Sequence, residues 1–283
     1  MPITPSPLRY PGGKTAYASM ISEIIQKNNL SGCSYAEPFA GGAGAAITLL
    51  LNNQVKDIWL NDFDHAIYAF WHSILEKTED FIIKIKNTPI TICEWKKQKT
   101  IYANKSVKSD IFSVGFATFY LNRCNRAGIL LANPIGGINQ TGKDKIDARF
   151  KKEVLISKIK KIAQQKSRIH LFNLDATNFI DVIKKEKSKI MVYFDPPYYK
   201  KGELLYLNFY RHDDHKKLSK KIINSKFPWL LSYDDHPEIV DLYNKFPVYK
   251  RKLHYSVFNS SWAQELIISN LNIPENLRGQ NVS

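Results

Sequence analysis

The most constraining feature of the sequence is an apolar run that two prolines end. Ile190–Phe194 is a β-rich stretch, and Asp195-Pro196-Pro197-Tyr198 follows it directly. Proline cannot donate to a sheet ladder, and the residue before a proline is disfavoured in the helical region. The strand must therefore end at Asp195, which leaves a carboxylate and an aromatic ring at the carboxyl edge of a sheet. Open α/β sheets bind their ligands at that edge.

An earlier segment has the form of a nucleotide-binding strand-turn-helix unit. Ser34–Glu37 predicts a short strand, and a glycine-rich turn then leads into an apolar helix. Gly41 and Gly44 allow the backbone to lie against a ligand. The acid at the start of the turn, Glu37, would repel a pyrophosphate but suits a ligand that carries a cationic centre and an amino group.

The next predicted strand, Lys56–Leu60, also ends beside carboxylates. Nucleotide-binding folds use an acid at this strand tip to hold ribose hydroxyls, and Asp62 is predicted to take that position. Asp64 is the fallback, although it is better explained as the N-cap of a helix over His65–Leu75.

Near the N-terminus, Arg9-Tyr10-Pro11-Gly12-Gly13-Lys14 predicts a tight turn ahead of a helix over 15–28. The turn presents an aromatic ring and a cation, and its spacing is not that of a Walker phosphate loop. In this order the motifs resemble those of the Dam-like, adenine-specific DNA methyltransferases of the Asp-Pro-Pro-Tyr type, over about Arg9 to Asn270. The resemblance implies an α/β fold: a Rossmann-like, seven-stranded, mostly parallel sheet with an inserted helical target-recognition domain.

The resemblance also implies S-adenosyl-L-methionine as the cofactor. The residues it implies for cofactor binding are Tyr10, Lys14, Glu37, Phe39, Gly41, Gly44, Asp62, Asp175 and Asp195. Asp175 follows a predicted strand over 168–172, where relatives place an acid or polar group near the adenine of the cofactor. A helix N-cap explains Asp175 equally well.

The implied reaction is methyl transfer to the N6 amine of an adenine flipped out of double-stranded DNA. Flipping costs a few kcal/mol, and stacking on Tyr198 would offset about 1–3 kcal/mol of that cost. Asp195 and the carbonyl of Pro196 would accept the hydrogens of the amine and direct its lone pair at the methyl group. Asp195, Pro196 and Tyr198 are therefore the predicted catalytic residues, and no nucleophilic cysteine is needed.

Between residues 77 and 166 the alternation of strand and helix stops, and helical periodicity takes over. We expect a catalytic domain of residues 1–76 and 167–283, interrupted by a helical insert, 77–166. The insert contains an Asn- and Arg-rich segment, where the resemblance implies a hairpin that enters DNA. Arginine and asparagine read base edges and phosphates, and the predicted DNA-binding residues are Asn122, Arg123, Asn125, Arg126 and Asn139. The usual Phe-Asn-Gly-Leu run of the family is absent, and a polar surface loop is the alternative.

Composition agrees with an anionic partner. Lys and Arg number 41 against 26 Asp and Glu, a net charge of +15, which favours a polyanion such as DNA, although a solvated lysine-rich surface is the alternative. The basic segments Lys143–Arg149 and Lys151–Gln164 are expected to contact phosphates or water. Cysteines 33, 93 and 124 lack metal-ligand spacing and fit a reducing compartment. With no segment like a signal peptide or a membrane span, we expect a cytoplasmic protein.

The sequence is compatible with several alternatives. His212-Asp213-Asp214-His215 looks like a set of metal ligands, but it begins a predicted helix, where acids suit the helix dipole, and no metal is expected. A methyltransferase of cytosine amine, RNA or protein glutamine would share the cofactor motifs. A non-catalytic DNA-binding module would share the charge but would not need four strand-end motifs. A cognate restriction endonuclease is left open as a partner, and neither the oligomeric state nor the recognition sequence follows from the sequence.

Overall fold

The computed structural model describes residues 4–9, 14–106, 108–199, 210–255, 261–278 and 280–281. Tyr10, one of the predicted cofactor-binding residues, lies outside these ranges. Among the described residues, no helix is both long enough and apolar enough to cross a membrane.

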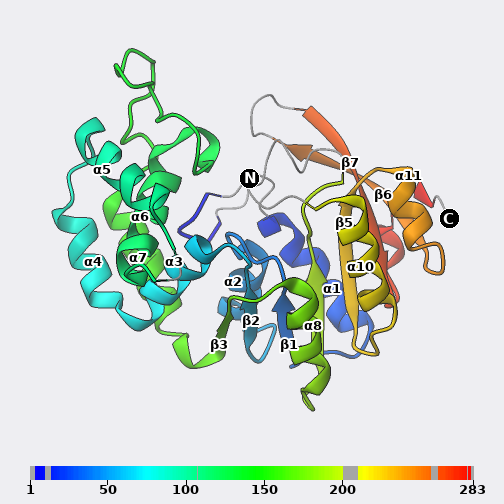
Figure 1. Ribbon diagram of the computed structural model, residues 1–283. Helices are drawn as coiled ribbons and strands as arrows, with labels where there is room; N and C mark the ends of the chain where they lie inside the picture. Colours follow the sequence, from blue (N-terminus) through cyan, green and yellow to red (C-terminus); the bar gives the residue numbers. More distant parts are fainter. Residues whose placement is uncertain are drawn as a thin grey trace.

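One mixed sheet forms the centre of the molecule, in the strand order β3-β2-β1-β4-β5-β7-β6-β8 (Figure 1). Its strands are β1 (Ser34–Glu37), β2 (Ile58–Asn61), β3 (Ile169–Phe172), β4 (Ile190–Phe194), β5 (Trp229–Asp234), β6 (Val248–Tyr255), β7 (Ser261–Ser269) and β8 (Gln280–Asn281). The five strands from β3 to β5 are parallel, and β7 runs antiparallel to both β5 and β6. The predicted Rossmann-like, seven-stranded, mostly parallel sheet is confirmed, and the two-residue β8 extends it at the β6 edge.

Helices alternate with the parallel strands, except between β2 and β3, where several follow one another. The α-helices are α1 (Tyr17–Lys27), α2 (Gly44–Leu51), α3 (His65–Glu76), α4 (Thr78–Asn87), α5 (Ile92–Ala103), α6 (Ile111–Cys124), α7 (Lys152–Ala163), α8 (Ala176–Lys185), α10 (His212–Ile223) and α11 (Pro237–Leu242). Short 3₁₀ turns are η1 (Lys14–Ala16), η2 (Arg126–Gly128), η3 (Lys166–Arg168) and η4 (Glu275–Leu277).

Both faces of the sheet are covered, which explains the nearly continuous apolar run of β4. Successive side chains of a strand point to opposite faces, so Met191 and Tyr193 join one core while Ile190, Val192 and Phe194 join the other. The first core is shared with α1, α2 and α3, and the second with α8, α10 and α11. A strand buried on both faces has no need for polar residues until its end, and this is where the site residues begin.

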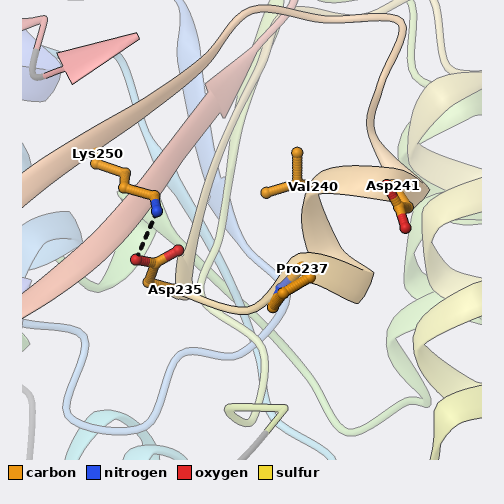
Figure 2. Close-up of a pocket in the computed structure, with 5 residues that line it drawn as sticks. All are labelled: Asp235, Pro237, Val240, Asp241 and Lys250. Carbon is orange, nitrogen blue, oxygen red and sulfur yellow. Dashed lines mark ion pairs between the residues drawn. The ribbon is translucent and has the colours of Figure 1, made fainter. Parts of the chain in front are cut away.

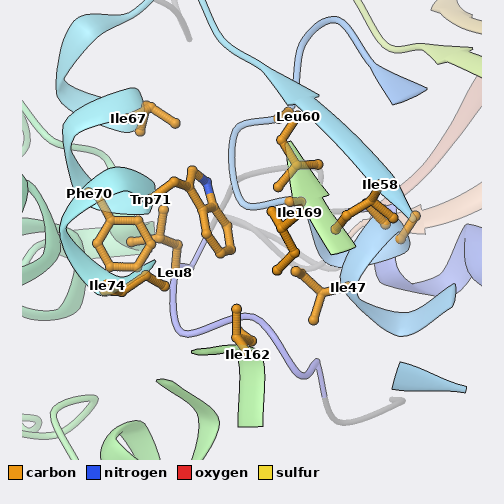
Figure 3. Close-up of a cluster of buried hydrophobic side chains, with 14 of the residues drawn as sticks. Leu8, Ile47, Ile58, Leu60, Ile67, Phe70, Trp71, Ile74, Ile162 and Ile169 are labelled. Carbon is orange, nitrogen blue, oxygen red and sulfur yellow. The ribbon is translucent and has the colours of Figure 1, made fainter. Parts of the chain in front are cut away.

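The helices between β2 and β3 share the core of the first face. In Figure 3, Leu8 from the N-terminal segment and Ile162 from α7 lie in the same cluster as Trp71 of α3 and Leu60 of β2. Figure 1 shows α4–α7 gathered to the left of the sheet, beside α3. Continuous packing from sheet to insert holds the insert at a defined place next to the strand ends.

Candidate active site

Four neighbouring parallel strands each end beside an acid that the sequence singled out. Glu37 is the last residue of β1, Asp62 follows β2, Asp175 lies shortly after β3, and Asp195 directly follows β4. Because the four strands are parallel and adjacent in the sheet, their carboxyl ends meet at one edge. The structure therefore brings these four predicted residues to the same edge.

Glu37 is a deeply buried acid with two hydrogen-bond donors. Its Oε1 accepts from the Tyr35 hydroxyl at 3.1 Å and from the Ala46 N–H at 3.0 Å. Burial raises the pKa of Glu37 to about 8, against the opposing effect of the two hydrogen bonds, and the charge of Asp195 raises it further. Glu37 therefore changes its charge near neutral pH.

The glycine-rich turn after β1 is anchored on two sides. Its Gly41 N–H donates to Asp62 Oδ2 at 2.8 Å, and its carbonyl accepts from the Trp71 indole at 2.9 Å. Gly41 has a φ of 46°, in the left-handed region that favours glycine. At Gly44 a Cβ would overlap the side chain of Thr15, so the start of α2 packs closely against η1. The turn and the N-terminal segment are thereby held together.

Asp62 and Asp64, at the end of β2, have different hydrogen-bond partners. Asp62 also accepts from the Asp64 N–H at 2.9 Å. Burial raises the pKa of Asp62 to about 7, the charge of Asp64 adds to the rise, and the N–H donors oppose it. Asp64 accepts from the Ala66 N–H and is the N-cap of α3, as predicted. Asp175 likewise caps α8 by accepting from Thr177, so the capping explanation for Asp175 is observed.

Lys14 lies between two carboxylates at the centre of the site. Its ammonium is 3.1 Å from Asp195 Oδ1 and 3.1 Å from Glu265 Oε1, and the lysine side chain is only 8% exposed. Burial lowers the pKa of Lys14, but the two carboxylates outweigh that effect and raise it well above its usual value. Lys14 is therefore a cation. Asp195 also accepts from the Ser232 hydroxyl on β5 at 2.9 Å.

Glu265 is a site residue that the sequence analysis missed. It lies on β7, pairs with Asp234 at the end of β5, and is 1% exposed. Besides Lys14, its carboxylate accepts from the hydroxyls of Tyr17 and Tyr198. The only signal in the sequence is an acid directly before the apolar run Leu266–Ile268. Its place beside Asp195 depends on the reversed direction of β7, which no local pattern predicts.

The aromatic residues after β4 point in different directions. Tyr198 is half-buried, and its ring lies 5.5 Å from the Lys14 ammonium. Tyr199 donates its N–H to Asp234 at 2.8 Å, and its ring lies 4.3 Å from that of His236. Tyr198 thus faces the lysine, while Tyr199 turns to β5 and α11.

Phe39 and Pro196 are two further predicted site residues that lie close to the strand ends. Phe39, in the glycine-rich turn, is half-buried with its ring 5.8 Å from Tyr210. Pro196 is buried directly after Asp195.

In α10, Asp213 and Asp214 lie in the first turn, and no group of three potential metal ligands is found among the described residues.

Two of the predicted DNA-binding asparagines are buried and fully engaged inside the protein. Asn122, 1% exposed, donates to the Arg9 carbonyl and accepts from the Arg9 N–H, each at 2.7 Å. Asn125, 0% exposed, donates to the Ile129 carbonyl at 2.9 Å and accepts from the Trp95 indole at 2.7 Å. In this structure, neither amide is available to a base.

The other three predicted DNA-binding residues are at least partly accessible. Arg126 and Asn139 are exposed, and Arg123 is half-buried, with its Nε donating to the Arg149 carbonyl at 2.8 Å. The segment that carries them folds back on itself, and its two arms meet at an isolated antiparallel bridge between Asn125 and Pro134.

Four cations lie together beside this segment, and we call Arg9, Arg123, Arg149 and Lys158 the cationic cluster. Arg9 donates to the Asn125 carbonyl at 3.1 Å, and Lys158 lies 3.3 Å from the Ser6 carbonyl. None of the four forms an ion pair with a carboxylate of the described residues. Burial and then repulsion by Arg9 lower the pKa of Arg123 to about 10. Burial and then the positive charge of Arg123 lower the pKa of Lys158. Such a cluster is a favourable place for an anion.

A cavity of about 230 Å³ lies elsewhere, between the end of β5, α11 and β6 (Figure 2). It is lined by Asp235, Pro237, Val240, Asp241 and Lys250, and the Lys250 ammonium pairs with Asp235 at 2.9 Å. None of these residues is among the strand-end acids, so this cavity is separate from the site described above.

An open, mostly parallel sheet, a glycine-rich first turn and acids at successive strand ends define a protein of the Rossmann-like α/β class. A family model described as D12 class N6 adenine-specific DNA methyltransferase matches residues 10–257. The chain belongs to this family, which confirms the resemblance to Dam-like enzymes, and it methylates the N6 of adenine in DNA. No curated protein matches the chain.

Proposed function

We propose that the strand-end site binds S-adenosyl-L-methionine and methylates an adenine flipped out of double-stranded DNA, with Asp195 and Tyr198 acting on the base. The observation that carries this proposal is the convergence of Glu37, Asp62 and Asp195 on one sheet edge, beside the glycine-rich turn. A methylation reaction needs a donor site and an acceptor site within bonding reach, and this edge offers groups suited to both.

The donor side fits a ligand that has hydroxyls and positive charge. Glu37 and Asp62 have pKa values of about 8 and about 7, so each can become a carboxylate when a hydroxyl or a cation arrives. When bound, the cofactor supplies an electrophilic methyl group on a positively charged sulfur. The residues proposed to hold it are Tyr10, Lys14, Glu37, Phe39, Gly41, Gly44, Asp62, Asp175 and Asp195.

On the acceptor side, Asp195 is proposed to orient the adenine amine. Its carboxylate is 24% exposed, so it is accessible from the strand-end edge. Accepting one hydrogen of the amine there, and a second at the Pro196 carbonyl, would align the nitrogen lone pair with the methyl group. We propose that the proton leaves late, so that Asp195 acts by orientation and charge and is not a strong base.

Tyr198 is proposed to stack on the flipped base. Taking a base out of the duplex costs a few kcal/mol, and a stacked aromatic ring returns about 1–3 kcal/mol. The half-buried ring of Tyr198 directly follows the two prolines after Asp195, which restrict the backbone that carries it. The rigid turn would therefore hold the stacking ring at a constant distance from the orienting carboxylate.

For DNA, the accessible residues Arg123, Arg126 and Asn139 are proposed contacts, and the cationic cluster is proposed to hold phosphates. The division into a catalytic domain, 1–76 and 167–283, and an insert, 77–166, is part of the same proposal. We also propose a cytoplasmic location, supported by the DNA substrate and by the free cysteines Cys33, Cys93 and Cys124. Pairing with a cognate restriction endonuclease stays a prediction from the resemblance.

The experiment is incubation of the protein with radiolabelled S-adenosyl-L-methionine and duplex DNA, followed by nucleoside analysis. Asp195→Ala should lower the methylation rate by roughly a thousandfold or more, because it removes the orienting acceptor. Binding of DNA should change by less than about threefold. Asp80→Asn, an exposed change in the first turn of α4, is the charge-matched control. Turnover preserved in Asp195→Ala would remove Asp195 from the mechanism.

A further inference from the structure

Glu265 is a buried carboxylate that the proposed reaction does not yet use. It is 1% exposed, and three donors converge on it: the Lys14 ammonium at 3.1 Å and the hydroxyls of Tyr17 and Tyr198. Isolating a carboxylate from water is costly unless its acceptor positions are filled. These three donors occupy both carboxylate oxygens, so Glu265 is held in one position.

Lys14 is shared between Glu265 and Asp195, at 3.1 Å from each, but the two carboxylates differ in access. Asp195 is 24% exposed, whereas Glu265 lies behind it in the protein interior. An incoming adenine amine can therefore reach Asp195 and cannot reach Glu265. Of the two carboxylates, Glu265 is the one that the substrate does not contact, and Lys14 also donates to the Tyr198 hydroxyl at 3.2 Å.

This arrangement matters because Lys14 donates to the Asp195 oxygen that also accepts from Ser232. The other Asp195 oxygen, Oδ2, accepts no hydrogen bond from the described residues and is open to the adenine amine, whereas an amine that binds Oδ1 has to displace one of these two donors. A buried ammonium without a carboxylate partner would be costly. The charged and titratable groups that face Lys14 are Asp195, Glu265, Tyr198, Tyr17 and Tyr193. When Lys14 is displaced from Asp195, Glu265 is the acid that remains for it.

We propose that Glu265 is a positioning residue for methyl transfer. It retains Lys14 when Asp195 binds the adenine amine, and it holds the Tyr198 hydroxyl so that the tyrosine ring stays in its stacking orientation. This inference rests on the roles proposed above for Asp195 and Tyr198. Glu265 acts through Lys14 and Tyr198 and does not touch the base.

Glu265→Gln is the first test, since glutamine keeps the size of the side chain and removes its charge. The kcat for methylation should fall roughly a hundredfold, because a misplacement of about 1 Å costs that much. The KM for DNA should change by less than about threefold, because Glu265 itself does not touch the DNA and the proposed phosphate contacts belong to the cationic cluster. Wild-type kcat in a folded Glu265→Gln protein overturns the inference.

A fluorescence measurement separates this inference from the proposed function. With 2-aminopurine in place of the target adenine, the wild-type protein should raise the fluorescence on binding, as the base leaves the stack. Glu265→Gln should retain a fluorescence increase while losing turnover. No increase with the wild type contradicts the proposed base flipping. An increase in both proteins together with equal turnover contradicts the role of Glu265 alone.

A double-mutant cycle with Tyr198→Phe tests the second contact. Both changes remove the same hydroxyl–carboxylate hydrogen bond, so their effects on kcat should not be independent. The kcat of the double variant should be about tenfold higher than the value obtained by multiplying the two single decreases. If the decrease in kcat of the double variant equals the product of the two single decreases, the contact between Glu265 and Tyr198 has no role in positioning. Tyr243→Phe is the control, because the Tyr243 hydroxyl is buried with no hydrogen-bond partner in the described structure, and its kcat should equal that of the wild type.

If Glu265→Gln does not fold, as judged by circular dichroism, the tyrosine variants carry the test. Tyr198→Phe keeps the stacking ring and removes only the hydroxyl that Glu265 binds. Its kcat should fall about tenfold with an unchanged KM for DNA. Wild-type kcat in Tyr198→Phe would show that the hydroxyl has no positioning role, and the inference would then be wrong.

Discussion

Glu37 and Asp62 are acids whose charge depends on their burial more than on any partner. Burial is the largest cause of the raised pKa of each, and hydrogen bonds from N–H groups and a tyrosine only partly oppose it. Each acid therefore holds a proton at pH values where an exposed carboxyl is ionised. A ligand that needs the carboxylate has to displace this proton, so binding and pH are coupled.

The affinity for S-adenosyl-L-methionine should accordingly rise with pH. With its pKa at about 7, Asp62 is mostly protonated at pH 6 and mostly ionised at pH 8, and the proposed binding of the ribose hydroxyls needs the ionised form. Cofactor affinity should be roughly tenfold higher at pH 8 than at pH 6. Glu37, with its pKa at about 8, acts in the same direction and extends the rise. Calorimetry in buffers of different ionisation enthalpy measures both affinity and proton release.

Asp62→Asn is the control for this pH dependence, because asparagine cannot titrate. The step in affinity near pH 7 should disappear in Asp62→Asn, while the part due to Glu37 remains. An affinity that does not change between pH 6 and pH 8, with no proton released by the wild type, would contradict the prediction.

At the scale of elements, α6 is the helix that places the insert against the rest of the protein. Phe119 of α6 stacks on Phe70 of α3 at 5.9 Å between ring centroids. Gly115 allows this approach, because a Cβ there would overlap the carbonyl of Ala69 and the side chain of Ser73. The backbone of α3 cannot move away without disturbing the core behind it.

Gly115→Ala should therefore destabilise the protein despite the better helix propensity of alanine. Overpacking of a close helix contact costs about 1–3 kcal/mol, more than the roughly 1 kcal/mol gained from propensity. Urea unfolding measures the free energy of unfolding. Lys161→Ala, at an exposed position of α7, should stay within about 0.5 kcal/mol of the wild type. A Gly115→Ala protein more stable than the wild type would show that α6 does not pack as described.

We expect the cationic cluster to contribute to the contact between the protein and DNA. Arg149→Gln and Lys158→Gln should each weaken binding of duplex DNA about equally for all sequences. Each should also reduce the slope of log affinity against log salt by about 1, as expected for the loss of one phosphate contact. Fluorescence anisotropy at several salt concentrations measures the slope. Lys184→Gln removes the same charge from α8, outside the insert, and should leave the slope unchanged. Equal slopes for all proteins would exclude the cluster from DNA binding.

At the scale of the whole molecule, the meeting of successive strand ends could be predicted from the order of motifs along the chain, whereas the contact of Glu265 with those strand ends could not. An acid at the end of a predicted strand, such as Glu37 or Asp195, can be recognised from the local sequence. Parallel pairing of the strands then brings these acids to one edge of the sheet. Glu265 joins them only because β7 runs antiparallel. Asn122 resembled a DNA contact because a polar side chain next to arginines has the same local pattern whether it faces solvent or another segment.

Asn122 connects distant parts of the chain and should be important for stability. Its side chain donates to the carbonyls of Arg9 and Gly128 and accepts from the Arg9 N–H. Asn122→Ala leaves these backbone groups without partners and should lower the free energy of unfolding by about 2–4 kcal/mol. Asn139→Ala, at an exposed position, should change it by less than about 0.5 kcal/mol. A thermal or urea unfolding curve for Asn122→Ala that matches the wild type would contradict this role.

The contact between Asn122 and Arg9 has a mechanical consequence for the enzyme. Arg9 is bound to the end of α6, and Lys14, five positions further along the chain, is bound to Asp195 and Glu265. A segment of that length reaches at most about 18 Å when fully extended. If a movement of the insert on DNA would separate Arg9 from Lys14 by more than this distance, either the hydrogen bonds between Asn122 and Arg9 have to break or Lys14 has to leave its two carboxylates. In the proposed mechanism, binding of the duplex to the insert and alignment of the reactive groups are therefore coupled through the short segment between Arg9 and Lys14.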